Sequence, residues 1–208
     1  MIVCLPVEGF LEENCYVWVD EKTGHGFLID PGARGGEIWD QCTERGWIIE
    51  RILLTHGHFD HIGGIDAIRA RQEIPVWIHE NGIDYLRNPR LNLSAYFGKE
   101  ITVDRVRTFR DGDVFRLQAD PSRFLRVIHT PGHTPDSVLF YDEAEGTAFT
   151  GDTIFQGNRG NDTFPGGDGK LLLKSIRERV LTLPGETKLY SGHSGPTTVA
   201  AERPLYLS

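Results

Sequence analysis

The feature that most constrains this chain is a histidine-rich segment, Thr55 to Gly64, which directly follows the apolar run Ile52 to Leu54. Its central part reads H-G-H-F-D-H. Side chains alternate with a period of two in extended backbone, so His56 and His58 point to the same side and can reach one ion. The aspartate and the last histidine fall where the next helix is expected to begin. The segment therefore predicts a strand, a ligand-bearing loop and a helix in immediate succession.

Metal binding explains this crowding better than packing does. Three imidazoles and a carboxylate within six residues gain no evident packing benefit, and the start of a helix repels positively charged imidazolium. Neutral imidazole and carboxylate suit zinc, iron or manganese better than calcium. Cysteine is absent from the segment, which disfavours a closed structural zinc site. We therefore expect an open first-row metal site.

Further candidate ligands follow glycine at the ends of three other predicted strands, as His133, Asp152 and His193. Glycine beside a ligand allows the backbone to turn sharply and to approach an ion closely. The complete candidate set is His56, His58, Asp60, His61, His133, Asp152 and His193. A group of ordinary hydrogen-bonded residues at strand ends would not account for this joint spacing.

Short apolar runs that end in turn signals predict strands along the chain. These runs are Val3 to Val7, Tyr16 to Val19, Phe27 to Ile29, Ile52 to Leu54, Val76 to Ile78, Phe124 to Ile128, Val138 to Tyr141, and Ala148 to Thr150. The first five include helical crossovers, whereas the last three are joined by tight turns and are expected to be antiparallel.

Helices are predicted between some of these strands. One runs from near Gly35 to Gly46, and a helical pattern of isoleucines begins at Ile62. Another starts at Asp168, which can accept hydrogen bonds as an N-cap, and ends before Pro184. The expected fold is α/β (α+β), with two mixed sheets flanked by helices. The segment from Arg87 to Lys99 lacks a pattern and is expected to be loop or irregular helix that overhangs a site.

Composition excludes several classes of function. The net charge is -8, with 30 acidic against 22 basic residues, so nucleic acid is not an expected partner. No apolar run approaches the roughly 18 residues of a membrane span, and no cationic leader precedes the first run, so we expect a cytoplasmic protein without membrane contact. The cysteines lack the spacing of a redox or zinc motif and are interpreted as buried hydrophobic residues: Cys4, Cys15 and Cys42.

The series H-x-H-x-D-H, G-H, G-D and G-H resembles the metallo-β-lactamase superfamily, and its small glyoxalase II-like (hydroxyacylglutathione hydrolase-like) branch in particular. The resemblance runs from Glu13-Asn14-Cys15-Tyr16, through Leu28-Ile29-Asp30-Pro31-Gly32, to the tail. It implies a four-layer αββα sandwich over a single domain, residues 1–208, with the metals at one edge of the two sheets. We expect this single domain to be without the helical C-terminal domain with which full-length glyoxalase II helps to hold glutathione.

The resemblance also implies roles for the candidate ligands. The first of two divalent ions would be held by His56, His58 and His133, and the second by Asp60, His61 and His193. Asp152 would bridge them, and Asp30 would be a structural acid beside the ligands. Zinc is the expected metal, with iron or manganese as alternatives. True β-lactamases of the superfamily place a cysteine in the second site and lack a histidine at the position of His61, so another hydrolase is favoured.

Two ions about 3.5 to 4 Å apart can share a water and lower its pKa, which supplies a hydroxide that bridges the metals. We expect this hydroxide to attack an acyl carbon, with Asp60 orienting it as the catalytic residue. A thiolate leaving group, with an ordinary pKa of about 8.5, needs no strong general acid. The predicted reaction is hydrolysis of S-lactoylglutathione or a similar small acyl thioester.

Alternatives remain for the function and for the substrate side of the site. A persulfide dioxygenase with a single iron, a lactonase-type hydrolase and a non-catalytic metal-binding module are the competing classes. Relatives commonly have an arginine where Asn161 stands, and Arg159 lies two residues earlier, where it could bind a substrate carboxylate. Outside the ligand set, His129 is the best candidate to support the ligands, whereas His25 and His79 are expected to be structural or surface residues. The oligomeric state is left open.

Overall fold

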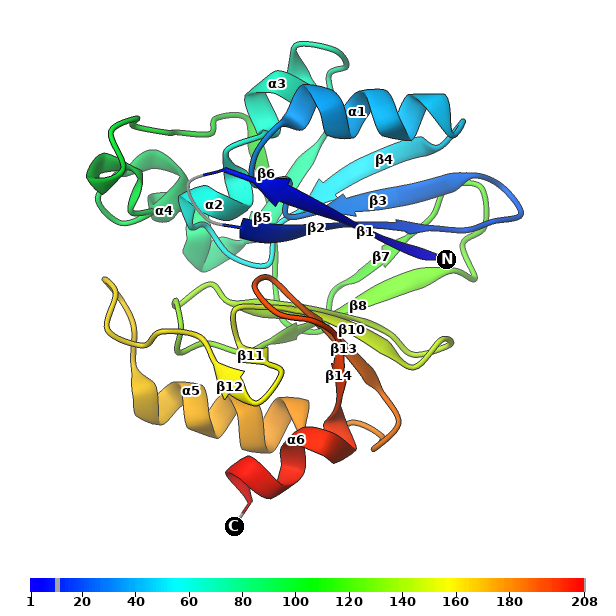
Figure 1. Ribbon diagram of the computed structural model, residues 1–208. Coiled ribbons are helices and arrows are strands. Elements are labelled where there is room, and N and C mark those ends of the chain that lie inside the picture. The colour runs from blue at the N-terminus through cyan, green and yellow to red at the C-terminus, as the bar shows by residue number, and fades with distance from the viewer. Residues whose placement is uncertain (10–11, 208) are drawn as a thin grey trace.

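A computed structural model of the chain describes residues 1–9 and 12–207. Within these residues most strands belong to two six-stranded sheets (Figure 1). In spatial order, the first sheet consists of β1 (Ile2–Glu8), β2 (Glu12–Val19), β3 (His25–Ile29), β4 (Ile48–Leu53), β5 (Val76–His79) and β6 (Val106–Phe109). Its first three strands pair antiparallel and the remaining pairs are parallel, so the sheet is mixed.

The second sheet is also mixed. In spatial order it consists of β14 (Thr197–Thr198), β13 (Lys188–Ser191), β10 (Thr147–Gly151), β9 (Val138–Asp142), β8 (Phe124–His129) and β7 (Val114–Arg116). The pair of β10 and β13 is parallel, and the other pairs are antiparallel. A small ribbon of β11 (Ile154–Phe155) and β12 (Asn158–Arg159) follows β10. The predicted strand runs all lie in these strands, apart from Leu54, which falls just beyond β4.

Helices cover the outer face of each sheet and complete four layers in the order αββα, as predicted (Figure 1). The first sheet is covered by α1 (Gly35–Glu44) and α3 (Ile65–Arg69). The second is covered by α5 (Gly169–Ser175), its π-helical continuation η3 (Ile176–Val180) and α6 (Val199–Tyr206). Shorter helical segments lie towards one edge: α2 (Phe59–Ile62), η1 (Glu80–Gly82), α4 (Ile83–Arg87) and η2 (Ser94–Tyr96).

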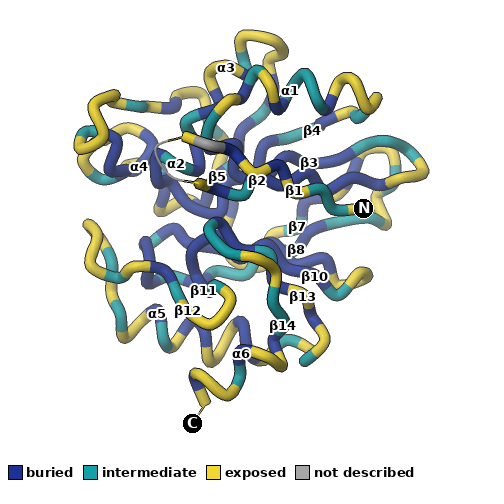
Figure 2. Tube along the Cα trace, in the orientation of Figure 1, coloured by how far each residue is buried: buried dark blue, intermediate teal, exposed yellow. Residues whose placement is uncertain are grey.

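The alternation of side chains along the strands divides the buried residues among three cores. In β2, Tyr16 and Trp18 pack between the sheets, whereas Val17 and Val19 pack against the helices on the outer face. In β9, Phe140 points into the core between the sheets and Leu139 into the core beneath α5 and α6. Figure 2 shows the resulting buried segments along the strands of both sheets. Each sheet is therefore buried on both faces, which holds its strand ends firmly in place.

The helical pattern of isoleucines that begins at Ile62 is divided between α2 and α3, which differs from the single predicted helix. The break is at Gly63 and Gly64, where the backbone passes very close to the loop after β3. A Cβ on Gly64 would lie 2.7 Å from the carbonyl oxygen of Pro31, to which the Gly64 N–H donates a hydrogen bond of 2.8 Å. A continuous helix with side chains could not approach this closely, so tertiary packing overrides the helical pattern.

The other two predicted helices begin where expected, and the second is α-helical to Ser175 and π-helical from there to Val180. The side chain of Asp168 accepts hydrogen bonds from the backbone N–H groups of Lys170 and Leu171, which confirms it as the N-cap of α5. The helix α1 ends at Glu44, shortly before Gly46, which has a positive φ of 70°. Among the described residues, no helix combines the length and apolar character needed to cross a membrane.

We expect Phe140→Ala to lower the free energy of unfolding by about 3–5 kcal/mol, because it leaves a cavity between the sheets. Phe140 is fully buried there against the rings of Phe109 and Phe115. Urea denaturation of the metal-free chain measures the change. Leu205→Ala is the matched control, since Leu205 is 56% exposed on α6. A Phe140→Ala variant as stable as this control would contradict the assignment of the core.

Candidate metal centre

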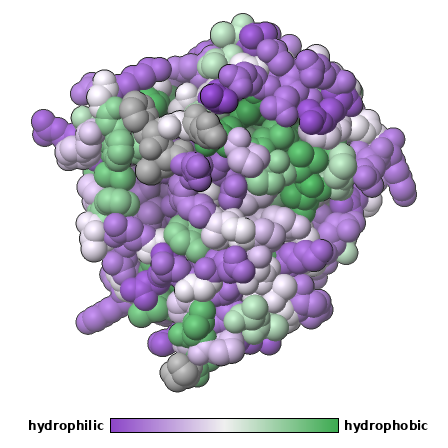
Figure 3. All heavy atoms as spheres, viewed as in Figure 1, coloured by the Kyte–Doolittle hydropathy of each residue, from purple (hydrophilic) through white to green (hydrophobic). Residues whose placement is uncertain are grey.

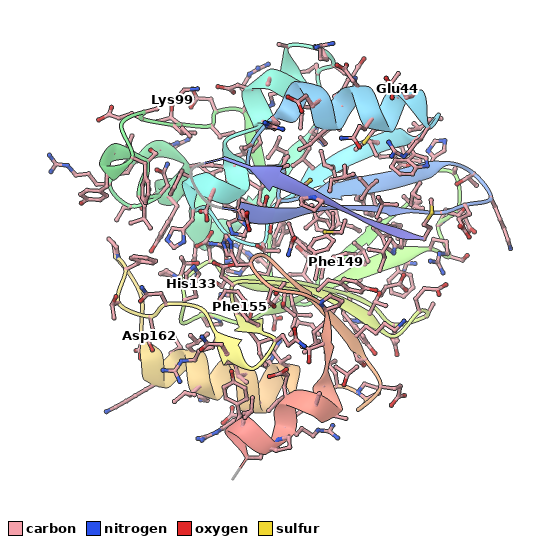
Figure 4. The ribbon with its side chains drawn as sticks, in the orientation of Figure 1. Glu44, Lys99, His133, Phe149, Phe155 and Asp162 are labelled. Atoms are coloured by element: carbon pink, nitrogen blue, oxygen red, sulfur yellow. The ribbon has the colours of Figure 1, made fainter. Side chains whose placement is uncertain are left out.

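The predicted ligands come together at one edge of the sandwich, where strands of both sheets end (Figure 4). His56 and His58 lie in the loop after β4, while Asp60 and His61 lie in α2. The second sheet contributes ligands from the loops that follow β8, β10 and β13: His133, Asp152 and His193. The loops are adjacent because the sheets pack face to face, so residues distant in sequence reach one site.

Three imidazoles form the first group of donor atoms. The Nε2 atom of His56 lies 3.1 Å from Nδ1 of His58, and Nε2 of His133 lies 3.0 Å from that same Nδ1. Ligands at about 2.0–2.1 Å from a tetrahedral zinc ion are separated by roughly 3.3 Å. All three rings are buried. The nitrogens are thus spaced much as a single ion would require.

A second group combines carboxylates with imidazoles. Nε2 of His193 lies 3.2 Å from Oδ2 of Asp60 and 3.4 Å from Oδ2 of Asp152. The other oxygen of Asp152 lies 3.4 Å from Nε2 of His61. Oδ2 of Asp152 is also 3.6 Å from Nε2 of His133, a member of the first group. Asp152 therefore stands between the two groups, where the resemblance placed a bridging ligand.

Oxygen atoms behind the rings orient most of these imidazoles. Nδ1 of His56 faces Thr55 Oγ1 at 3.1 Å, and Nδ1 of His61 faces Asp30 Oδ2 at 3.0 Å. Nδ1 of His133 faces the Asn161 carbonyl at 2.7 Å, and Nδ1 of His193 faces the Glu12 carbonyl at 2.6 Å. An outer N–H donated to oxygen leaves the lone pair of Nε2 free on the inner side. The outer hydrogen bonds therefore orient these rings with Nε2 toward the site, as a metal ligand needs.

Asp30 is the hub of this support. Its Oδ1 accepts a hydrogen bond of 2.8 Å from the Thr55 N–H, and its Oδ2 accepts one of 2.6 Å from the Thr55 hydroxyl. The same Oδ2 faces Nδ1 of His61. One buried carboxylate thus fixes the start of the histidine-rich loop and a ligand in α2. Its own backbone has a φ of 50°, which is uncommon for aspartate.

The buried polar atoms test whether the site fits a metal. Nε2 of His61 and Oδ1 of Asp152 are buried and make no hydrogen bond with the described residues. Buried polar atoms without partners are costly, and these two point at each other across the site. A cation between them would satisfy both. The donor set of imidazole nitrogens and carboxylate oxygens therefore fits first-row divalent ions.

The electrostatics of the two groups differ. Burial lowers the pKa of His58 to about 3, and it lowers the pKa of His56 as well, so these rings are neutral donors. Burial alone would lower the pKa of His193 too, but Asp152 and Asp60 outweigh it and raise that pKa to about 10. In the metal-free protein the second group compensates its carboxylates with protons, and a metal ion would displace them.

Glu13 is a neighbour of the site to which the sequence analysis gave no role. It is 2% exposed, and its Oε1 lies 3.8 Å from Nδ1 of His61. Burial raises its pKa well above the usual range. Neither carboxylate oxygen has a hydrogen-bond partner within the described part of the chain. The signal was available, since residue 13 shares its strand face with Cys15 and Val17, and that face is buried.

A cavity of about 580 Å³ opens over the metal-binding side chains. Five of the predicted ligands line it: His58, Asp60, His133, Asp152 and His193. Its remaining walls are largely apolar and include Leu93, Tyr96, Phe97, Phe155, Phe164 and Pro165. The segment from Arg87 to Lys99, predicted to overhang a site, supplies the first three of these.

The structure does not bring Arg159 to this cavity. Its guanidinium donates a hydrogen bond of 3.0 Å to Oδ2 of Asp162, and Arg159 is absent from the described lining. The guanidinium of Arg159 is thus paired with a carboxylate of the same chain. The binding of a substrate carboxylate by Arg159 stays a prediction. Asn161, beside it, does line the cavity, and its carbonyl orients His133.

The other histidines lie outside the centre. Nε2 of His129 donates to the Pro135 carbonyl at 2.8 Å, and its ring stacks on His79 at 4.1 Å. His129 thus supports the loop that carries His133 without a recorded contact to a ligand. Nδ1 of His25 pairs with Glu50 at 2.7 Å. His25 and His79 have the structural roles that were expected.

Comparison with known proteins matches most of this chain. The model of the family described as "Metallo-beta-lactamase superfamily" matches residues 9–193. The chain is 37% identical to the probable metallo-hydrolase YqgX of Bacillus subtilis, over 96% of this chain and 92% of that protein. It is 31% identical to the hydroxyacylglutathione hydrolase GloC of Haemophilus influenzae, over 97% of this chain and 94% of the relative.

Solved structures agree over nearly the whole length. The BLEG-1 B3 metallo-beta-lactamase superposes with a TM-score of 0.91 at 34% identity, covering 98% of this chain and 97% of that one. TTHA1623, crystallised in a di-iron-bound form, superposes with a TM-score of 0.83 at 34% identity, covering 95% and 96%. These similarities confirm the predicted sandwich.

Elemental analysis should find two divalent ions per wild-type chain and about one in a His58→Ala variant. This variant loses Nδ1 of His58, the atom that lies close to Nε2 of both His56 and His133. Removal of the ions with a chelator should lower the melting temperature, and zinc at about 100 times its Kd should restore about 2.7 kcal/mol. His25→Ala is the matched control and should keep both ions. Two ions retained by His58→Ala would contradict the assigned ligands.

The stability of the metal-free protein should fall between pH 7 and pH 5, partly through His79. Burial, with His129 beside it, lowers the pKa of His79 to about 4. Between pH 6.5 and 4 the unfolded chain therefore binds a proton that the folded chain refuses, so acid favours unfolding. From pH 7 to pH 5, the free energy of unfolding should decrease by about 1 kcal/mol less in His79→Gln than in the wild-type chain, with solvent screening included. Urea titrations at both pH values measure it, and equal losses in the two proteins would refute the assignment.

Proposed function

This chain belongs to the metallo-β-lactamase superfamily, and on that premise we propose that it is a binuclear metal-dependent hydrolase of small acyl thioesters. The relative named hydroxyacylglutathione hydrolase supports the thioester, with S-lactoylglutathione as the model substrate. The placement of Asp152 is the observation that carries the proposal. Its Oδ1 faces His61 of the second group, and its Oδ2 faces both His133 of the first group and His193 of the second, as a carboxylate shared by two cations would.

The proposed ligands follow from the two groups of donors. One ion would be held by His56, His58 and His133, and the other by Asp60, His61 and His193. Asp152 would be shared between them. Zinc suits these donors, and so do iron and manganese. The di-iron-bound form of TTHA1623, at 34% identity, supports a centre of two ions.

When bound, the two ions would supply an activated water near neutral pH and stabilise negative charge on an acyl oxygen. Asp60 lines the cavity, where its carboxylate can accept a hydrogen bond from that water and orient it. Burial would raise the pKa of Asp60, but His61 and His193 outweigh it and lower that pKa, so the carboxylate is ionised at neutral pH. The apolar walls keep bulk water away from the reacting groups.

The thioester follows from the groups available to assist a leaving group. Within the described lining, each histidine belongs to the proposed ligand set, and no lysine is present. A thiolate, with an ordinary pKa of about 8.5, departs near neutral pH without full protonation. The cavity therefore suits a leaving group that makes small demands on a general acid.

A second candidate function is β-lactam hydrolysis. One similar structure, at 34% identity, is named a B3 metallo-beta-lactamase. The residue types of the second group led us to favour another hydrolase, yet a protein of that name shares this fold along nearly the whole chain. A β-lactam therefore belongs beside thioesters and lactones in the substrate panel.

The decisive test uses purified chain loaded separately with zinc, iron or manganese. Free thiol should be released from S-lactoylglutathione without oxygen consumption, and faster than the β-lactam nitrocefin or a lactone is opened. Asp60→Asn should lower kcat/KM by about 10²- to 10⁴-fold, the usual contribution of a positioned acid–base group. Elemental analysis of that variant separates loss of catalysis from loss of metal.

His25→Ala is again the matched control and should retain full activity. Thiol release by none of the three metal forms, in protein shown to hold two ions per chain, would overturn the proposed reaction. Oxygen-dependent formation of sulfite from glutathione persulfide by a form with one iron would instead establish the dioxygenase alternative.

A further inference from the structure

We infer, on the basis of the proposed thioester hydrolysis, that the substrate carries an uncharged apolar group beside the scissile bond and that aromatic walls over the centre bind it. The walls come from separate parts of the chain. Tyr96 and Phe97 belong to the segment between α4 and β6, Phe155 ends β11, and Phe164 lies between β12 and α5. Figure 4 shows Phe155 on the same side of the molecule as His133.

The aromatic rings adjoin the ligands on more than one side. The ring of Phe164 lies 5.7 Å from that of His58 and 6.3 Å from that of His133, both nearly edge to face. The ring of Phe155 lies 6.0 Å from that of His193 at 90°. A group attached directly to a reacting carbonyl or its sulfur would contact these rings. The walls thus meet the substrate next to the bond that is cleaved.

Exposure of these rings sets them apart from the other aromatic residues. Tyr96 is 67% exposed, Phe97 37% and Phe164 36%. Among the described residues, these are all of the large aromatic side chains in the exposed class, and each lines this one cavity. The space-filling view shows several apolar patches within a largely hydrophilic surface, one of them on the side where α4 lies (Figure 3). Exposed aromatic surface gathered in one concave site is typical of ligand recognition.

Charge points to the same class of substrate. The described lining of the cavity contains no lysine or arginine, and it includes the acidic Glu12. Arg34 and Lys99 line an adjoining cavity of about 330 Å³, which shares Phe59 and Asp60 with this one, and Arg159 is paired with Asp162. Within the described lining of the cavity itself, the carboxylates of a glutathionyl group would find no cationic side chain. An aromatic ring or an alkyl chain would be complementary to the walls, with the metal charge left to act on the carbonyl.

Four thioesters distinguish where the apolar group lies. S-phenylacetyl-N-acetylcysteamine carries a ring on the acyl side, and S-benzyl thioacetate carries one on the thiol side. S-acetyl-N-acetylcysteamine carries no ring, and S-acetylglutathione carries a charged thiol. For the zinc-loaded chain, kcat/KM of at least one ring-bearing ester should exceed that of both other esters by tenfold or more. The preferred ester identifies the side of the scissile bond.

Phe164→Ala should lower kcat/KM for the preferred ester by about 10- to 100-fold, and should lower it less for the ring-free ester, so that the preference shrinks. Phe164→Leu should recover part of it, because an apolar side chain is restored. Leu205→Ala, which changes an exposed apolar residue on α6, is the matched control and should alter neither rate. Equal rates for ring-bearing and ring-free esters, unaffected by Phe164→Ala, would overturn the inference while thioester hydrolysis stands.

Calorimetry keeps the two proposals separable when no ester is cleaved. Phenylacetate should bind the zinc-loaded chain at least tenfold more tightly than acetate, and Phe164→Ala should abolish the difference. That result without hydrolysis would refute the proposed reaction and retain the apolar site. Equal binding of phenylacetate and acetate, without hydrolysis, would refute both.

Discussion

Buried carboxylates beside histidines are the constraint on which the rest of this structure depends. Asp60 and Asp152 lie where strands of both sheets end, and away from bulk water their negative charge requires a positive partner. In the metal-free protein, His61 and His193 meet this need by holding protons, as their raised pKa values show. Divalent ions meet it better, because they also satisfy the buried atoms that make no hydrogen bond. The site is therefore arranged for cations before any ion binds.

The scaffold meets this constraint through close approaches that only glycine permits. Gly132, with a φ of 137°, lies against the backbone of Leu172 at the start of α5, and a Cβ there would collide with it. Gly151, with a φ of 48°, lies against the side chain of Thr55, which Asp30 anchors. A side chain at either glycine would push away the loop that carries His133 or Asp152. Gly151 thus sets the spacing between the sheets at this edge, and Gly132 sets the distance between the His133 loop and α5.

The sandwich and the grouping of the candidate ligands were predictable because their signals are local: the candidates follow the ends of particular strands, and strand periodicity assigns faces. What depends on contacts between distant segments was not. The helix that begins at Ile62 is interrupted because Gly64 packs on the loop after β3, and sequence spacing contains no trace of that contact. The pairing of Arg159 with Asp162 was not predicted, because it depends on the path of an irregular loop. Phe97 and Phe164 meet over the centre from segments without a pattern, so their shared wall was not predicted.

The candidate ligands and the walls therefore lie in structurally different parts of the molecule. The ligands follow strands whose ends are fixed by burial on both faces, so altering one disturbs both the charge balance and the fold. Tyr96, Phe97 and Phe164 lie in loops and are exposed, so replacing one costs little stability and changes the surface beside the scissile bond. Proteins named for different activities, BLEG-1 and GloC, are similarly distant from this chain at 34% and 31% identity. In the proposed function the walls would therefore set the substrate preference, while the candidate metal ligands would set which bond is cleaved.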